Sequence, residues 1–379
     1  MTSRPPINVG IVGLTTNDKS SWAARAHLPY LLKSPHYRVQ GVCNRTVESA
    51  QLAIETFHLP SSARAYSSIA ELGADEEIDL VVVCTRVDTH YGIIKPLLER
   101  MEQEGEKKKD MFVEWPLGAN LAQGRELARL AREVNGPIKT VIGLQARMNP
   151  AFSKIKEILS SGRIGNVLSV DVRATAPNVV VEMPANRAYF ADRSSGGNLL
   201  TIRAMHVLDP AFFVHGEPVG PLRALLGNQV PYMLVKEEDG STKRIEKDTP
   251  DHIAISGHMA SASGPLFNFY MRGGKPFKDE PGLVWSVYGD EGEMQISCES
   301  SAIQMSFPLT VKIYDNKTDD VETVDVAGLD RGLCADLTPE ARDVGRLYEA
   351  YALGKDYGDW ELAVRRHELV EQIYREGGL

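Results

Sequence analysis

The sequence predicts an α/β protein with two domains. The N-terminal domain is expected to hold a doubly wound parallel sheet, and the C-terminal α/β domain a large, mostly antiparallel open sheet. Two observations support this prediction. Short apolar runs alternate with helical patterns over the first 145 residues, as in repeated β-α units. After Asn149-Pro150 the runs become longer and are separated by Gly, Pro and charged turns.

The N-terminal elements follow one another in regular alternation. The expected strands are 7–12, 38–43, 80–84, 111–114 and 138–144, and the expected helices are 20–32, 47–57, 91–103 and 121–134. The run 80–84 is continuously apolar, which is typical of a parallel strand buried on both faces. Residues 1–148 therefore have the pattern of a Rossmann nucleotide-binding domain.

The C-terminal domain is expected to span 149–379. Its helices are predicted at 151–161 and 200–214, and its strands at 167–174, 222–226, 252–260, 266–271, 283–288, 293–297 and 309–314. The final segment, 339–379, reads as two helices. The second has an apolar face, so we expect this segment to pack back on the body of the protein.

Composition limits the classes of function. The chain has 379 residues, 43% hydrophobic and 25% charged, which is ordinary for a soluble globular protein. The net charge of −9 argues against direct binding of nucleic acid or of an anionic membrane. The four cysteines are widely spaced, and no Cys/His cluster has the spacing of a metal site. No leader pattern and no run of about 20 apolar residues is apparent, so we expect a cytoplasmic protein.

Ligands of doubly wound sheets bind beyond the carboxyl ends of the strands. The residues at these ends are Gly13, Asn44, Thr85, Glu114 and Gln145. We therefore expect the binding site along this edge.

The first strand ends in a partial dinucleotide fingerprint. Gly10 and Gly13 are present, but Leu14 and Thr15 follow where a G-x-G-x-x-G motif would continue. Backbone N–H groups and hydroxyls of a longer loop, reaching to Trp22, could still bind a pyrophosphate. The alternative is a plain connection between strand and helix.

The second strand ends at Asn44, followed by Arg45. An NAD enzyme usually has an acidic residue at this place, whereas an arginine can bind a 2′-phosphate. We therefore expect NADP(H) to be preferred and NAD(H) to be possible. The alternative is that Arg45 is a solvated loop charge.

Several motifs in order along the chain resemble the glucose–fructose oxidoreductase, inositol dehydrogenase and MocA (Gfo/Idh/MocA) family. They are His27-Leu28-Pro29, Thr85 with His90-Tyr91, Glu114-Trp115-Pro116-Leu117, Gln145 to Pro150, and Gly196-Gly197 with His206 and Asp209. Within this family the sequence resembles in particular the branch of the fungal galactose-pathway regulator. The resemblance implies a Rossmann domain and a C-terminal open sheet through which a homodimer or homotetramer forms.

The resemblance also implies roles for single residues. In the family a lysine beside the nicotinamide polarises the substrate oxygen, and here Trp115 stands in its place. The implied cofactor residues are Glu114, Pro116 and His90 near the nicotinamide, Thr85 and Arg86 in the middle, and Thr15, Asn44 and Arg45 near the adenosine. An acid common in the family is replaced by Thr201, whereas His206 is retained as the implied acid/base.

Other polar side chains could polarise the substrate oxygen in place of the missing lysine. We name Tyr189, Arg203 and Lys275 for this purpose, each with the alternative of a packing or solvated role. The expected catalytic residues are then His206, Tyr189 and Lys275. The expected substrate-binding residues are Trp115, Arg147, Tyr189, Arg203, His206 and Lys275.

Three hypotheses of function follow. The first is an NAD(P)-dependent oxidoreductase that transfers a hydride to or from a non-standard small molecule, in fungal secondary or sugar metabolism. The second is a non-catalytic dinucleotide-binding regulator or sensor. The third is a non-redox enzyme on the same scaffold.

Overall fold

The computed structural model describes residues 5–17, 21–103, 107–134, 136, 138–177, 182–260 and 264–379. They form two compact units. The first is Met1–Gln145 with Gly332–His367, and the second is Ala146–Arg331 with Glu368–Leu379. The predicted domains, 1–148 and 149–379, differ from these units in two ways: the boundary lies three residues earlier, and Gly332–His367 belongs to the first unit. The segment from Gly332 to His367 has most of its contacts with the N-terminal residues, because its aromatic side chains pack there.

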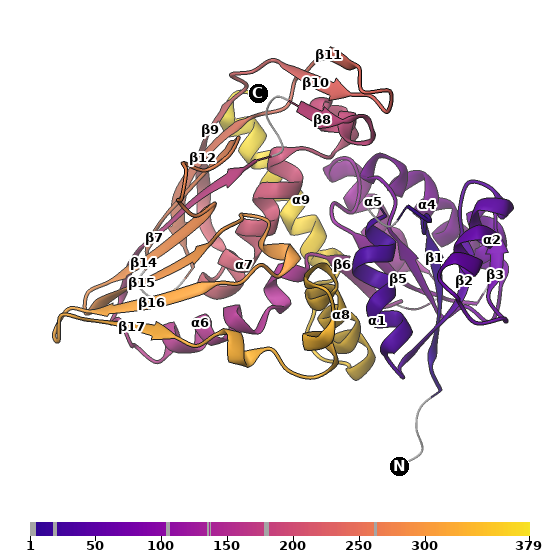
Figure 1. Cartoon of the computed structure of the whole chain (residues 1–379), viewed down its shortest axis with the longest axis horizontal. Coiled ribbons are helices and arrows are strands. Elements are labelled where there is room, and N and C mark those ends of the chain that lie inside the picture. Colours follow the sequence, from indigo (N-terminus) through magenta and orange to yellow (C-terminus); the bar gives the residue numbers. More distant parts are fainter. Residues whose placement is uncertain are drawn as a thin grey trace. The chain divides into compact units, whose positions relative to one another are not determined.

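The first unit is built on a six-stranded parallel sheet in the order β3-β2-β1-β4-β5-β6 (Figure 1). The strands are β1 (Ile7–Val12), β2 (Tyr37–Cys43), β3 (Arg64–Tyr66), β4 (Leu80–Val83), β5 (Asp110–Glu114) and β6 (Thr140–Gly143). All five pairings are parallel. All four residues of β4 are buried, as a central parallel strand requires. The predicted Rossmann architecture is confirmed.

Three helices of the first unit begin at a side chain that caps them. The helices of this unit are α1 (Leu28–Lys33), α2 (Val47–Thr56), α3 (Ile69–Ala74), α4 (Val87–Gln103), α5 (Leu121–Glu133), α8 (Pro339–Leu353) and the start of α9 (Trp360–Gly377), with a π-helical turn η1 (Ala23–His27) and a 3-10 turn η8 (Leu333–Asp336). Thr46, Ser68 and Asn120 each accept a backbone N–H of the first turn that follows. The sequence pattern missed β3 and α3, which are too short for a periodic signal.

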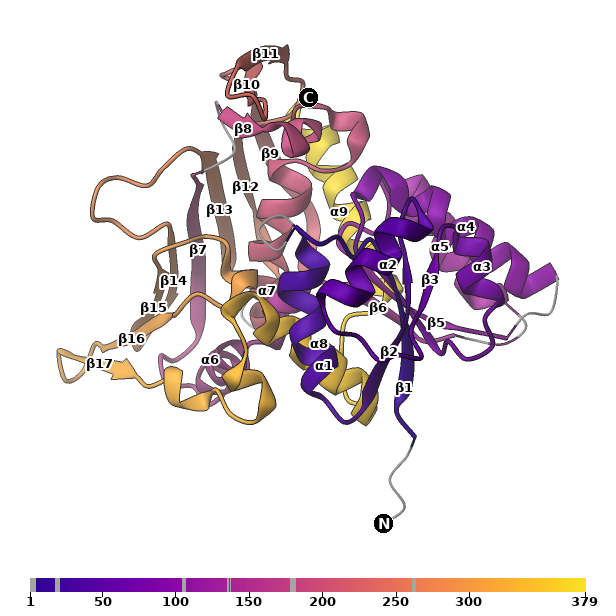
Figure 2. The same ribbon diagram turned by 45° about the vertical axis from the view of Figure 1, so that its right-hand side comes forward.

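The second unit contains a large sheet of eight strands in the order β17-β16-β15-β14-β7-β13-β12-β9 (Figure 2). They are β7 (Val167–Ala176), β9 (Pro218–Gly227), β12 (His252–Met259), β13 (Leu266–Gly273), β14 (Leu283–Gly289), β15 (Gly292–Cys298), β16 (Thr310–Asp315) and β17 (Asp320–Val324). Only the β7–β13 pairing is parallel. The predicted mostly antiparallel sheet is confirmed.

Shorter elements complete the second unit. They are a three-stranded sheet of β8 (Glu182–Pro184), β10 (Tyr232–Lys236) and β11 (Thr242–Glu246), the helices α6 (Pro150–Ser160), α7 (Met205–His215) and the end of α9, the π-helical turn η5 (Leu199–Ala204), and 3-10 turns η2 (Gln145–Met148, which begins at the last residue of the first unit), η3 (Ala185–Ala191), η4 (Arg193–Ser195), η6 (Ile303–Met305) and η7 (Ala327–Leu329).

The large sheet has one covered face and one open face. Aromatic pairs join the covered face to α6 and α7: Phe152 stacks on Trp285, and Phe212 packs against Phe267. On β13 the residues alternate between exposed and buried, with Tyr270 on the exposed side. This alternation is the pattern of an antiparallel sheet with a solvated face.

A buried ion pair connects β11 to the start of β12. The Lys247 ammonium donates to Asp251 at 3.0 Å, to the side chain of Asn228 at 2.8 Å and to the carbonyl oxygen of Thr249 at 3.1 Å. Asp251 also accepts from two backbone N–H groups, at Gln229 and Val230. Both charges are almost fully buried, so the cluster depends on having every partner in place.

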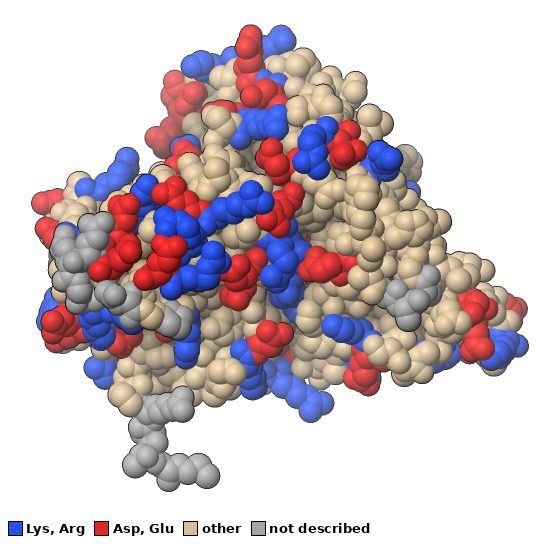
Figure 3. All heavy atoms as spheres, turned by 180° about the vertical axis from the view of Figure 1, so that it is seen from behind, with Lys and Arg blue, Asp and Glu red and all other residues tan. Residues whose placement is uncertain are grey.

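The charged side chains of the surface and the polarity of the helices are those of an ordinary globular protein. Positive and negative side chains are interspersed over the face seen in Figure 3. None of the helices in the described part of the chain is long and apolar enough to cross a membrane.

Candidate functional site

The turn after β1 requires glycine at position 13. Gly13 has a φ of +94°, and a Cβ atom there would lie 2.9 Å from Cγ2 of Thr85. Its N–H donates to the carbonyl oxygen of Cys43 at 3.0 Å. The ends of β1, β2 and β4 therefore meet at this turn. Because Gly13 has no side chain, a ligand can approach the backbone here. Of the next two residues, Leu14 is buried and Thr15 is exposed.

Asn44 offers an acceptor that nothing in the described chain uses. Its Nδ2 donates to the carbonyl oxygens of Leu14 at 2.8 Å and of Ser49 at 3.1 Å, which fixes the orientation of the amide. Its Oδ1 is buried and has no hydrogen-bond partner among the described residues. The Nε1 of Trp22, after the same loop, is a buried donor in the same condition. A ribose hydroxyl donating to Asn44 would satisfy one of these atoms, so the residues fit a dinucleotide.

Arg45 is exposed just before Thr46, the N-cap of α2. Within the described ranges it forms neither an ion pair nor a hydrogen bond, and it therefore remains available to a ligand. Arg86 is different, because its guanidinium donates to Asp88 at 2.7 Å.

His90 is held between two backbone carbonyl oxygens. Its Nδ1 lies 2.9 Å from the oxygen of Pro116, and its Nε2 lies 3.0 Å from the oxygen of Thr85. Burial lowers the pKa of His90, although the two carbonyls oppose that shift. The neutral ring has one N–H, which it donates to one of these oxygens, and the imidazole contacts both the loop after β4 and the loop after β5. A contact with the nicotinamide would have to use the face of the ring.

Glu114 ends β5 at the head of a buried chain of hydrogen bonds. Its carboxylate lies 2.8 Å from Nε2 of His27, and Nδ1 of the same ring lies 2.7 Å from the hydroxyl of Tyr348. An ionised Glu114 can only accept, so His27 donates through Nε2 and accepts from Tyr348. The chain fixes the carboxylate. His27 was visible in the sequence as part of a motif, whereas Tyr348 had no local signal.

Trp115, at the position of the missing lysine, is 5% exposed. Its ring lies 4.8 Å from that of His367, centroid to centroid, and the following peptide bond to Pro116 is cis. Burial lowers the pKa of His367 to about 4, so this imidazole is neutral at pH 7. Trp115 is thus mainly a packing residue of the first unit, and little of its surface is open to a ligand. Gln145, at the end of the predicted edge, is buried.

In the second unit, a pair of glycines lets Tyr189 approach the start of the π-helical turn. A Cβ atom at Gly197 would lie 2.6 Å from Cε2 of Tyr189. Asn198 caps this turn, since its Oδ1 accepts the N–H groups of Leu200 and Thr201. Thr201 completes the cap by accepting the N–H of Asn198 at 2.8 Å. The residue in place of the expected acid therefore stabilises the helix start.

Arg203 and His206 follow on the same continuous helix. His206 is buried in the first turn of α7. Burial, together with the positive charge of Arg187, lowers the pKa of Arg203 to about 10, and Tyr189 acts in the opposite direction. Arg203, Arg187 and Tyr189 thus lie close enough to influence one another. Arg187 was not among the residues expected from the sequence.

The two remaining predicted residues of this unit differ in their environment. Arg147 forms a two-pronged ion pair with the buried Asp209, with one bond of 2.7 Å from Nε. Its charge is therefore compensated within the protein. Lys275 is exposed beyond the end of β13, and no described residue pairs with its ammonium group. Its carbonyl oxygen accepts a hydrogen bond from Arg272 at 3.0 Å.

Comparison with known families agrees with this architecture. Residues 7–140 match the oxidoreductase family with an NAD-binding Rossmann fold (GFO_IDH_MocA), and residues 150–298 match the C-terminal domain of Gal80p. The dehydrogenase aclE of Aspergillus oryzae is 30% identical over 302 residues, which cover 78% of each chain. The galactose/lactose metabolism regulatory protein GAL80 of Kluyveromyces lactis is 28% identical over 309 residues. That match covers 80% of this chain and 66% of the regulator, just under two thirds of its length.

Solved structures show the same fold. A super-repressor mutant of Gal80p from Saccharomyces cerevisiae superposes with a TM-score of 0.86 at 22% identity, covering 99% of this chain and 97% of the other. Levoglucosan dehydrogenase in complex with NADH and L-sorbose gives a TM-score of 0.75 at 17% identity, with 98% and 97% covered. The chain belongs to the Gfo/Idh/MocA family of NAD-binding oxidoreductases, near its Gal80 branch.

Proposed function

We propose that this protein is an NADP(H)-dependent oxidoreductase acting on a small carbonyl or hydroxyl compound. The observation that carries the proposal is the preformed cradle at the ends of β1 and β2. There Gly13 leaves the backbone open, and the buried Oδ1 of Asn44 lacks a donor. A protein that no longer bound a dinucleotide would have no need to keep this acceptor buried and unpaired.

The dinucleotide would supply the hydride. Asn44 and Arg45 would hold its adenosine end, and Glu114, fixed by His27, would stand at the nicotinamide end. His206 would donate or accept the proton on the substrate oxygen, because histidine is the side chain that most often acts as a general acid or base. With Trp115 buried in place of the lysine, Lys275 and Tyr189 are the candidates to polarise that oxygen.

A second candidate function is a non-catalytic dinucleotide-dependent regulator. Two observations favour it: Trp115 replaces the lysine, and the relatives include regulatory proteins of galactose metabolism. Such a protein would bind the dinucleotide and show no turnover. Oxidation of NADPH in the presence of a carbonyl substrate separates the two functions.

Arg45 is expected to determine the preference between the dinucleotides. Arg45→Ala should weaken NADPH binding by about 10-fold to 100-fold, the effect of one lost charge-assisted contact. NADH binding should change little, because NADH has no 2′-phosphate. Calorimetric titration of the parent and the variant with NADPH, NADP, NADH and NAD measures both effects.

The matched control is Arg38→Ala, which changes an exposed arginine at the opposite end of β2 from Arg45. It should leave all four affinities unchanged. Tighter binding of NADH than of NADPH by the parent protein would refute the NADP(H) preference. No binding of any of the four would refute the dinucleotide site itself.

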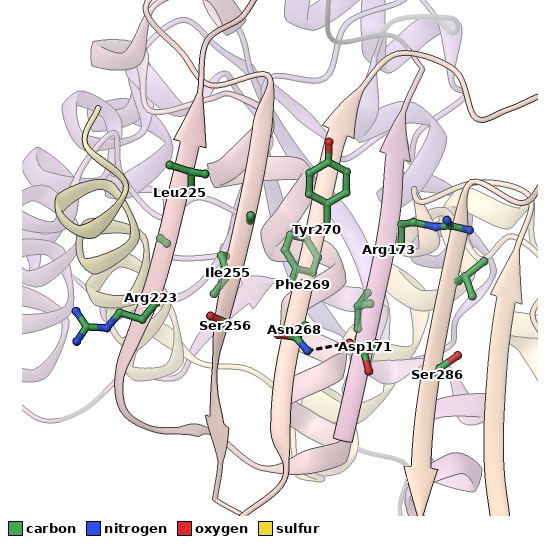
Figure 4. Close-up of a pocket in the computed structure, with 14 residues that line it drawn as sticks. Asp171, Arg173, Arg223, Leu225, Ile255, Ser256, Asn268, Phe269, Tyr270 and Ser286 are labelled. Carbon is green, nitrogen blue, oxygen red and sulfur yellow. Dashed lines mark hydrogen bonds between the residues drawn. The ribbon is translucent and has the colours of Figure 1, made fainter. Parts of the chain in front are cut away.

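We further propose that the open face of the large sheet binds a second copy of this chain. A hollow of about 570 Å³ lies on this sheet, bordered by Arg223, Leu225, Asp171 and Arg173 (Figure 4). Leu225 is 71% exposed, and Tyr270 and Tyr288 also stand exposed on this face. Apolar side chains among charges of both signs suit a self-complementary two-fold contact.

Leu225→Glu is therefore expected to convert the oligomer into monomers, because it places a charge in the middle of an apolar contact. Light scattering after size-exclusion chromatography gives the mass of each species. Leu52→Glu, which changes a leucine of α2 that is 53% exposed in the first unit, is the matched control and should keep the parent mass. A parent protein that is monomeric at all concentrations would exclude the proposed contact.

A further inference from the structure

Arg203 occupies an unusual stretch of helix. It lies in the π-helical turn η5, one residue before its end at Ala204, and three residues before His206. π-helical turns are rare and occur often at functional sites. The residue is partly exposed, yet its Nε is buried and meets no acceptor among the described residues. The guanidinium therefore enters the protein without a hydrogen-bonding partner at this atom.

Among the described residues, no acidic side chain compensates the charge of Arg203. Over the described ranges, no carboxylate lies within ion-pairing distance of its guanidinium, in contrast to Arg147, which pairs with Asp209. The charged side chain that does influence it is Arg187, which repels it. The second-unit residues outside the described ranges, 178–181 and 261–263, contain neither Asp nor Glu. The missing counter-charge is therefore not hidden in those segments.

A partly buried cation without an anion is unfavourable, because desolvation is not offset by attraction. Evolution can remove such a charge by a single substitution to an apolar residue. A ligand that brings the opposite charge explains why the arginine is there. The planar fork of a guanidinium matches the two oxygens of a carboxylate or of a phosphate.

We propose that Arg203, with Arg187 beside it, binds an oxyanion carried by the ligand of this protein. This deepens the proposed function, because the anion would belong to the substrate or to the dinucleotide. A substrate carboxylate would select 2-oxo or 2-hydroxy acids. A phosphate would come from a phosphorylated substrate or from the cofactor.

The test uses the full chain, without cofactor, and two probes: malonate as a carboxylate and inorganic phosphate. Thermal unfolding is followed at constant ionic strength, with chloride as the reference. We expect one or both probes to raise the Tm of the parent protein in a saturable way. Arg203→Met, which keeps the length of the side chain, should bind the probes about 10-fold to 100-fold more weakly. Arg331→Met, at an exposed arginine of the same unit, should respond as the parent does.

The Tm of Arg203→Met without an added anion also shows whether the charge of Arg203 is unpaired in the parent protein. Without an added anion, Arg203→Met should unfold at the same temperature as the parent or higher, because an uncompensated charge has been removed. A saturable response to malonate alone supports a substrate carboxylate. An equal response to phosphate, with weaker NADPH binding by Arg203→Met, supports the cofactor as the source.

Three results would overturn the proposal. They are a parent protein that responds to neither probe, an Arg203→Met variant that responds as the parent does, and a large fall in the Tm of that variant in the absence of anion. None of these measurements requires hydride transfer. A protein without oxidoreductase activity could therefore still pass this test, and an active one could fail it.

Discussion

A Lys247→Met variant is expected to lose about 3–5 kcal/mol of unfolding free energy, the usual effect of removing one partner of a buried ion pair. Methionine fills the space of the lysine stem but leaves the Asp251 carboxylate buried without its cation. It also removes donors from Asn228 and from the carbonyl oxygen of Thr249. Urea unfolding followed by circular dichroism measures the loss.

A control variant with an exposed ion pair tests whether the loss comes from burial of the charges. Lys317→Met breaks the exposed ion pair with Glu291 and should change the unfolding free energy by less than about 1 kcal/mol. A similar small change for Lys247→Met would show that the cluster tolerates an unpaired carboxylate.

The same variant should be more sensitive to acid. Burial raises the pKa of Asp251, but its hydrogen bonds from Gln229, His252, Val230 and Lys247 outweigh that effect and leave it below the ordinary value. A carboxyl with a lowered folded pKa stabilises the protein above its unfolded pKa of about 4, and this contribution is lost as the pH falls. Without Lys247 the folded pKa should rise, so acid unfolding should begin at a higher pH.

A His206→Ala variant is expected to lower kcat by about 10²-fold to 10⁴-fold, the usual contribution of one positioned acid or base. Dinucleotide affinity should be unchanged, because His206 is proposed to act on the substrate oxygen. The measurement is the oxidation of NADPH with the best substrate from a screen of 2-oxo acids and conjugated carbonyl compounds. The pH profile of kcat/KM should lose the limb that this acid or base produces.

His258→Ala is the matched control, since this histidine is exposed on β12 of the same unit. It should retain the parent kinetics. If His206→Ala kept the full rate, His206 would not be the acid/base. If kcat fell while the pH profile stayed the same, its role would be structural.

The order of the strands and helices followed from short-range patterns in the sequence. The apolar run at β4 and the alternation along β13 each specify one element and its buried face, because burial requires that pattern locally. The elements that escaped prediction carry no such pattern. β3 has three residues, and β17 is exposed along most of its length. The three-stranded sheet of β8, β10 and β11 depends on partners far apart in the sequence.

The candidate site could be predicted in location but not in detail. Gly13, Asn44 and Glu114 were expected at strand ends, and they lie there. Their individual states depend on residues distant in the chain. Glu114 is fixed through His27 by Tyr348, and Trp115 is covered by His367. A sequence motif identifies the residue type, but whether a side chain is free or already bonded depends on the folded neighbours.

The nucleotide-binding unit is assembled from both ends of the chain, and this has a consequence during synthesis. Tyr37 donates to the backbone of Tyr348 at 2.6 Å, and the indole of Trp360 donates to Val141 at 3.3 Å. The residues from Gly332 to His367 emerge from the ribosome only after the whole of the large sheet has been made. The six-stranded sheet therefore keeps part of its apolar surface uncovered until the segment Gly332–His367 has been synthesised.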